Sequence, residues 1–277
     1  MRSFQWPPAN KLMSVTQSNR RDNPEKGLCL FCSNPANSKE DLFPRWILAS
    51  VITRELLSRR IGDAETQLTE DQEVRIPCVC IPCNNGWMSR LETKCKPIIG
   101  NLLEDISIPL DPDYQKFLAV WALKGAMILD AEGSKPRFFR KDECENLKKS
   151  RTIPNGTGIW IGRFTGRTLS VINGGFSLAT EQDVLLARCD VFSVVVGHLA
   201  MQVLSVHEEP DPTNKTIQIA PVDGKWDELL IQIWPKSQKK VTWPPTLSFS
   251  HYGTHPYGSL VYRWTRPRGH SIRSRSR

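Results

Sequence analysis

Hydrophobic and polar positions follow different periods in the two halves of the chain. In the first half, apolar residues recur at helical spacing. This pattern predicts a helix from Pro44 to about Arg60, a second from Asn84 that breaks or kinks at Pro97, and a third capped by Asp111. Between the first two, residues 61–72 are expected to form a polar loop, and Glu73–Cys78 a short strand.

The second half changes to period two after a short charged helix expected near Asp142–Ser150. Alternation of this kind is typical of half-buried strands in an antiparallel sheet. The fold class is therefore predicted to be α+β, with helices before a small antiparallel sheet. The expected strands are Ile159–Ile161, Leu169–Val171, Val191–Val206 and Leu229–Trp234.

Composition narrows the class of protein. The chain has 277 residues, an apolar fraction of 39% and no apolar run long enough to span a bilayer. Its start, Met1–Gly27, is polar and lacks the apolar core of a signal peptide, so we expect a cytoplasmic location and no membrane partner.

The net charge of +8 favours a polyanionic partner. Arginines crowd the last residues, where they either bind phosphates or only keep the chain in solution: Arg266, Arg268, Arg273, Arg275 and Arg277.

The eight cysteines include two Cys-x-x-Cys pairs, Cys29/Cys32 and Cys80/Cys83. Two such pairs supply the four thiolates of a structural zinc site, which has no open coordination position for chemistry. Cys78 is a competing ligand, but only Cys80 keeps the two-residue spacing to Cys83. In a reducing compartment disulfides are the weaker alternative, and four cysteines are expected to be free thiols: Cys78, Cys95, Cys144 and Cys189.

Two carboxylates and an amide lie in segments that the zinc site would bring together. Glu40 and Asp41 precede the first predicted helix, and Asn84 directly follows Cys83. Carboxylate and amide oxygens are ligands of hard cations such as Mg²⁺. The sequence therefore predicts a second cation site between Glu40 and Asn84, with Asp41 beside it.

The motifs resemble the four-cysteine branch of the HNH endonucleases, and more narrowly a group of uncharacterised bacterial HNH-like proteins. The matching runs are SKEDLFPRW at Ser38–Trp46 and CIPCNNGWMSRLE at Cys80–Glu92, with weaker likeness over residues 112–130, Ile159–Gly162 and Trp243–Pro245. The resemblance implies a treble-clef, ββα-metal domain that cleaves DNA in a bacterial cytoplasm. It also implies that Glu40 and Asn84 hold a catalytic Mg²⁺ or Mn²⁺ ion.

The chain departs from that family at two positions. The family has a general-base histidine where this chain has Asp41. The middle Asn of the family's motif has no counterpart here, because Arg75 stands there instead. A carboxylate, with an ordinary pKa of ~4, is a poorer base at neutral pH than an imidazole at ~6.5. Asp41 is then a weak base, an added metal ligand or a cap for the following helix.

Three functions follow from these departures. The first is a metal-dependent HNH-type endonuclease weakened by Asp41, with Glu40, Asp41 and Asn84 as its catalytic residues. The second is a catalytically degenerate zinc-dependent module that binds nucleic acid or protein. The third is a regulator that binds a small molecule.

The histidines and arginines outside the motif receive less specific predictions. His198 is expected in the core, His251 and His255 offer a weak metal pair, and His207 and His270 are expected at the surface. Arginines predicted to contact nucleic acid are Arg45, Arg90, Arg273, Arg275 and Arg277.

The same patterns divide the chain into four parts. We expect a disordered lead-in at 1–23, an HNH-like zinc domain at 24–105, an α+β domain of unassigned role at 106–262 and a basic disordered tail at 263–277.

Overall fold

The computed structural model describes most of the chain between residue 27 and residue 264. The described residues are 27–51, 57–61, 64–68, 75–132, 137–179, 185–209, 219–221, 229–235, 240–249 and 262–264. Among them, no helix has the length and apolar character needed to cross a membrane. The structure is mixed, with helices and a mainly antiparallel sheet, which confirms the predicted α+β class.

In the N-terminal part, the cysteine motifs lie beside two paired strands: Cys29 and Cys32 in the turn before the first strand, and Cys80 and Cys83 at the start of the helical segment after the second. Strand β1 (Ser38–Asp41) pairs antiparallel with β4 (Arg75–Val79), with Glu40 opposite Ile76. Because Pro44 cannot donate a backbone hydrogen bond, it suits the point where β1 ends and the next helix begins. The helical elements here are α1 (Arg45–Val51), α2 (Ile81–Cys83), the π-helical turn η2 (Asn84–Met88) and α3 (Ser89–Leu103).

Helix α4 (Pro112–Asp130) is buried along almost all of its length, since neighbouring elements cover it on several sides. Its N-cap is Asp111, whose carboxylate accepts hydrogen bonds from the amides of Asp113 and Tyr114, as predicted. Helix α5 (Lys141–Ser150) follows and carries a charged outer face.

The sheet is built around one long hairpin, β6 (Thr157–Ala179) and β7 (Leu185–Glu208). Strand β7 lies along one edge of β6. Shorter strands pair with β6 in succession: β9 (Leu230–Trp234) antiparallel, then β11 (Ser248–Phe249) and β2 (Leu57–Ile61) parallel, with β3 (Ala64–Leu68) beyond β2. Two further pairs are β5 (Ile108–Leu110) with β10 (Val241–Trp243), and β8 (Ile219–Pro221) with β12 (Tyr262–Trp264).

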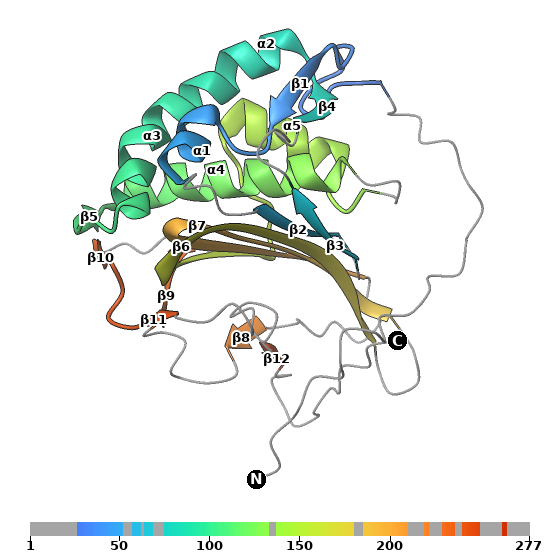
Figure 1. Ribbon diagram of the computed structural model, residues 1–277. Coiled ribbons are helices and arrows are strands. Elements are labelled where there is room, and N and C mark those ends of the chain that lie inside the picture. Colours follow the sequence, from blue (N-terminus) through green and yellow to red (C-terminus); the bar gives the residue numbers. More distant parts are fainter. Residues whose placement is uncertain are drawn as a thin grey trace.

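The helices form one layer over the curved sheet, and the β1–β4 pair lies on the far side of that layer (Figure 1). A single cluster of buried residues includes Phe31 and Trp87 near the cysteines, Leu123 in α4, and Val194 and Ile233 in the sheet. Residues on both sides of the predicted boundary at 105 therefore share one core, and α4 lies between the cysteine motifs and the sheet.

Several expected elements differ from the observed ones. The first helix does not continue to Arg60, because residues 57–61 form β2, and β3 lies within the predicted loop. Helix α3 does not break at Pro97, which is exposed, so water can reach the carbonyl group that the proline leaves without a partner. The sheet is not purely antiparallel, since β2 and β11 run parallel to β6.

The predicted ends of the chain lie almost wholly outside the described residues. This holds for the lead-in at 1–23 and for all of the predicted tail except residues 263 and 264, which belong to β12. The boundary between the two predicted domains stays a prediction.

Candidate metal centre

The four cysteines of the two Cys-x-x-Cys pairs lie together. Their sulfur atoms are all within 4.8 Å of one another, and Cys32 Sγ lies 3.5 Å from Cys80 Sγ and 3.6 Å from Cys83 Sγ. Four sulfurs bound to zinc at about 2.3 Å in a tetrahedron are separated by about 3.8 Å. In size and donor type the cluster therefore fits a metal ion such as zinc.

Backbone hydrogen bonds shape the turns that carry these sulfurs. The Cys29 amide donates to the Asn34 carbonyl (2.7 Å), and the Cys83 amide donates to the Cys80 carbonyl (3.0 Å). The Leu30 amide donates to the Cys78 carbonyl (2.7 Å), which joins the first turn to the end of β4. The two pairs converge because this bond holds the two turns together.

Burial and mutual contact set the acidity of the thiols. Burial raises the pKa values of Cys29 and Cys83. At Cys80 burial also acts to raise the pKa, but hydrogen bonds from the Cys83 backbone and the Cys32 thiol outweigh it and lower the value to about 7. A divalent cation would supply the positive charge that keeps buried thiols in the thiolate form.

Cys80 belongs to the cluster and Cys78 lies outside it, so Cys80 is the one of the two that is placed to bind a metal with the other three cysteines. Burial, followed by the charge of Glu40, raises the pKa of the Cys78 thiol to about 12. All eight cysteines belong to the described part of the chain, and none forms a disulfide. Cys78, Cys95, Cys144 and Cys189 are buried free thiols.

The Glu40 side chain forms an ion pair with a lysine of the same chain, Lys124. Its Oε1 atom accepts a hydrogen bond from Lys124 Nζ at 2.7 Å, and the side chains are only 9% and 3% exposed. Lys124 comes from the middle of α4, so the pair joins β1 to the helix beneath it. Lys124 was not predicted to have a role, although a single charge inside the apolar run Val120–Leu129 is a sequence signal for a buried partner.

Asp41 is the last residue of β1, and Asn84 contacts the first two residues of that strand. Asp41 Oδ1 is 2.9 Å from Arg75 Nε in the neighbouring strand β4. The Asn84 amide nitrogen donates to Ser38 Oγ (2.9 Å) and to the Lys39 carbonyl (3.1 Å). The structure thus brings Glu40, Asp41 and Asn84 to the same strand, while both carboxylates already contact cationic side chains.

The arginines of the motif lie at the surface near the cluster. Arg45 begins α1 and Arg90 lies in the first turn of α3, and both are exposed. The exposed residues of α3 include three cations, Arg90, Lys94 and Lys96, whereas Glu92 is half-buried and accepts a hydrogen bond from the Trp46 indole. The predicted contacts Arg273, Arg275 and Arg277 lie outside the described residues.

Two histidines have partners in the structure. His198 is partly buried, with Nδ1 2.9 Å from the Phe164 carbonyl oxygen. His207 was expected at the surface, but it is half-buried, stacks on Phe138 and contacts Glu143. That expectation was wrong because Glu143, which satisfies the imidazole, comes from an element distant in sequence. His251, His255 and His270 lie outside the described residues.

No family model, no curated protein and no solved structure matches the chain.

Proposed function

We propose that this protein is a zinc-stabilised nucleic-acid-binding protein whose HNH-like site is occupied by the protein's own cations. The buried contact between Glu40 and Lys124 carries the proposal. A divalent metal needs carboxylate oxygens that are free to bind it. Here the Lys124 ammonium neutralises Glu40 at 2.7 Å, and Arg75 neutralises Asp41.

Displacing Lys124 from Glu40 would be unfavourable. Lys124 lies in the middle of a buried helix, where an ammonium without its partner has neither water nor a counter-charge around it. A metal bound at Glu40 would create that situation and would also repel the ammonium. The site is therefore better suited to structure than to phosphodiester hydrolysis.

Nucleic acid is the partner that the charge pattern favours. The chain has a net charge of +8, and Arg90, Lys94 and Lys96 are exposed along α3, the helix that follows the cysteine cluster in the sequence. Exposed cations neutralise phosphates and release their counterions. The zinc ion would fix the start of α3 through Cys80 and Cys83, and so hold this helix in place.

The binding proposal is tested by a salt titration of a fluorescent DNA duplex with full-length protein. Replacing Arg90, Lys94 and Lys96 by Gln should weaken binding and reduce the slope of log affinity against log salt by about 0.9 for each phosphate that the protein no longer neutralises. A matched variant replaces three exposed cations elsewhere, Arg140, Arg188 and Lys240, and should leave the slope nearly unchanged. Equal effects of the two triple variants would contradict a specific role for α3.

A metal-dependent endonuclease acting on DNA is the second candidate. It is favoured by the attachment of the Asn84 amide to β1, beside Glu40 and Asp41. A bound Mg²⁺ or Mn²⁺ would polarise the scissile phosphate and stabilise the leaving oxygen. Glu40 and the Asn84 oxygen would bind that ion, and Asp41 would take the proton of the attacking water.

Plasmid nicking with Mg²⁺ or Mn²⁺ separates the two candidates. We expect little or no nicking by the natural protein and no gain with Asp41→His, because an imidazole base, which ordinarily contributes about 10²–10⁴-fold, has no bound metal to act with while Lys124 neutralises Glu40. Fast nicking by the natural protein that is abolished in Asp41→Asn, but kept in the exposed control Asp142→Asn, would establish the endonuclease instead.

A further inference from the structure

Helix α5 lies against the cysteine cluster although it is more than fifty residues away in sequence from Cys83. Lys141, in its first turn, directs its ammonium at the backbone of the first cysteine turn. The Nζ atom donates to the carbonyl oxygens of Cys29, Cys32 (2.8 Å) and Leu30 (3.4 Å). An ammonium has three hydrogens, so this contact uses all of its donors.

A second lysine of the same helix reaches the sulfur atoms. Lys148 follows Lys141 by seven residues, which is about two helical turns and places both on one face. Lys148 interacts electrostatically with Cys83 and also with Cys32 and Cys80. At the end of α5, the Arg151 guanidinium lies 4.7 Å from the centre of the Trp87 ring, four residues after Cys83.

We propose that Lys141 and Lys148 are positioning residues of the metal centre, which retain its ion by compensating the charge of the four thiolates. This inference rests on the zinc site proposed above and concerns how tightly that site keeps its metal. Four thiolates and one Zn²⁺ ion leave two surplus negative charges in a mostly buried cluster. The ammonium groups of α5 bring two positive charges, one to the sulfurs and one to the turn that carries them.

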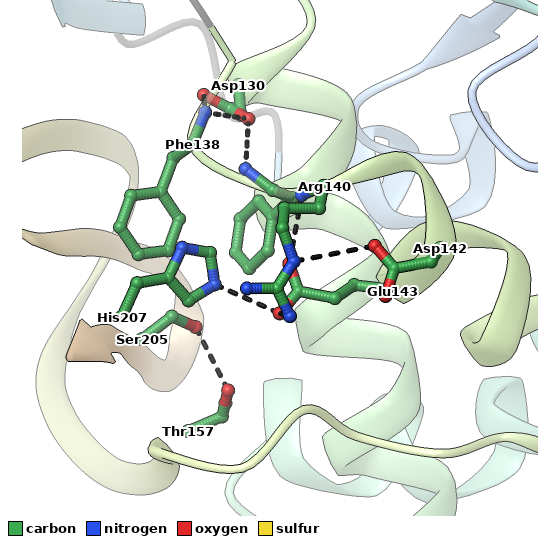
Figure 2. A network of polar contacts seen from close by, with 9 residues as sticks. Asp130, Phe138, Arg140, Asp142, Glu143, Thr157, Ser205 and His207 are labelled. Atoms are coloured by element: carbon green, nitrogen blue, oxygen red, sulfur yellow. Dashed lines mark hydrogen bonds and ion pairs between the residues drawn. The ribbon is translucent and has the colours of Figure 1, made fainter. Parts of the chain in front are cut away.

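The opposite side of α5 is fixed to the sheet, so the lysines are held in place. Glu143 is buried and accepts a hydrogen bond from the Arg140 amide (2.9 Å), and its Oε1 lies 3.0 Å from His207 Nε2 in β7 (Figure 2). The His207 ring stacks on Phe138 at a centroid distance of 4.2 Å. Because α5 is anchored in this way, its lysines reach the cluster from a helix that is already ordered.

The same arrangement lowers the reactivity of the sulfurs. A thiolate next to a positive charge is stabilised by that charge, so it attacks electrophiles and exchanges its metal more slowly. Partners that surround a metal's ligands typically contribute about 10–100-fold to metal affinity. We expect Lys148, whose charge interacts with three of the four cysteines, to have the larger effect of the two.

The test compares metal retention in full-length zinc protein. Lys148→Gln should lower zinc affinity, measured by competition with a chromogenic chelator, by about tenfold or more. Lys141→Gln should have a smaller effect in the same direction, and Lys148→Arg should restore affinity because it keeps the charge. The control is Lys149→Gln, an exposed lysine of the same helix whose partner is Glu145, and it should bind zinc like the natural protein.

Cobalt substitution gives a readout that a purely structural role would not change. Removing the positive charge at Lys148 should shift the thiolate-to-cobalt charge-transfer band to lower energy, whereas Lys149→Gln should leave it in place. Unchanged affinity and band position in Lys148→Gln, with helical content preserved, would overturn the inference. Absence of zinc from the natural protein would overturn the proposed metal itself and this inference with it.

Discussion

Lys124 shows how one residue can decide between two functions. Its ammonium is enclosed by α4 and β1 and has Glu40 as its partner at 2.7 Å. The position could be recognised from the sequence as a lone charge in an apolar helix, but the partner could not, because it lies 84 residues away. Conversely, the Cys-x-x-Cys spacing is local, and it predicted the complete four-sulfur cluster correctly.

The Glu40–Lys124 pair should make a large difference to stability when only one partner is removed. Glu40→Gln or Lys124→Met is expected to lower the free energy of unfolding by about 3–5 kcal/mol, because the remaining charge is buried and uncompensated. The double variant should be less destabilised than the sum of the two single effects. Urea unfolding measures all three.

An exposed pair provides the comparison. Glu145→Gln and Lys149→Met break a contact of 2.9 Å on the surface of α5 and should each change stability by no more than about 0.5 kcal/mol. If Lys124→Met changed the free energy of unfolding as little as these surface variants, the Lys124 ammonium would be hydrated or displaceable. The argument against a metal at Glu40 would then fail.

Asp190 should make the stability of the protein depend on pH. Burial, followed by the charge of Asp130, raises the pKa of the Asp190 carboxyl to about 8, and its Oδ2 atom is buried with no hydrogen-bond partner among the described residues. Between pH ~4 and about 8 the folded state therefore binds the proton that the unfolded state has released. The contribution of this carboxyl to the free energy of unfolding is fully present below pH ~4 and decreases as the pH rises to about 8.

Asp190→Asn replaces the titrating carboxyl group by an amide that does not titrate and has nearly the same shape. The variant should gain stability relative to the natural protein as pH rises from about 5.5 to about 8, which urea midpoints at the two pH values would show. Asp142→Asn, at an exposed position of α5, should show no such trend. A constant difference between Asp190→Asn and the natural protein across the range would mean that the carboxyl titrates normally.

At the scale of elements, periodicity predicted what local sequence controls. The cap at Asp111, the charged helix α5 and the strand β9 agree with their patterns. Strands β2 and β3 pair with each other, but they were missed because their sequences are polar and show little apolar alternation. The pairing of β2 with β6, more than 100 residues later, has no local signal. The burial of α4 on several sides also exceeded its one predicted apolar face, since coverage by β1 and the sheet is a tertiary property.

Gly197 is the element-scale position where a side chain should be costly. It has φ +57° in β7, opposite the irregularity between Arg163 and Thr168 of β6, and an added Cβ would lie 3.1 Å from the Leu103 carbonyl oxygen. Gly197→Ala should therefore reduce the free energy of unfolding by about 1–3 kcal/mol. Gly174→Ala, in β6 with open space around it, should stay within about 0.5 kcal/mol of the natural protein. Thermal or urea unfolding compares the two, and equal effects would mean that α3 can move away from β7.

At the scale of the whole molecule, the surroundings of the cysteine cluster and the sheet share one buried core. One buried cluster runs from Phe31 through Leu123 to Val194, and α5 contacts both the cysteine turns and β7. The sequence predicted two successive domains because the motif ends where the composition changes. It could not show that α4 and α5, which follow the motif, would close over the motif and complete its surroundings.

This continuity leads to a prediction about metal removal. The natural protein should contain one zinc ion per chain, and Cys83→Ser should fail to retain it, because structural zinc contributes on the order of 10 kcal/mol to sites of this kind. Since α4 and α5 join the cluster to β6 and β7, chelation should disrupt the sheet together with the cysteine turns. Elemental analysis measures the zinc content. During chelation, circular dichroism of the strands and tryptophan fluorescence should change together in one shared transition. Cys189→Ala, a buried thiol in β7 outside the cluster, should keep its zinc. A sheet that stays folded after complete removal of zinc would show that the two parts fold independently, as the composition of the chain alone suggested.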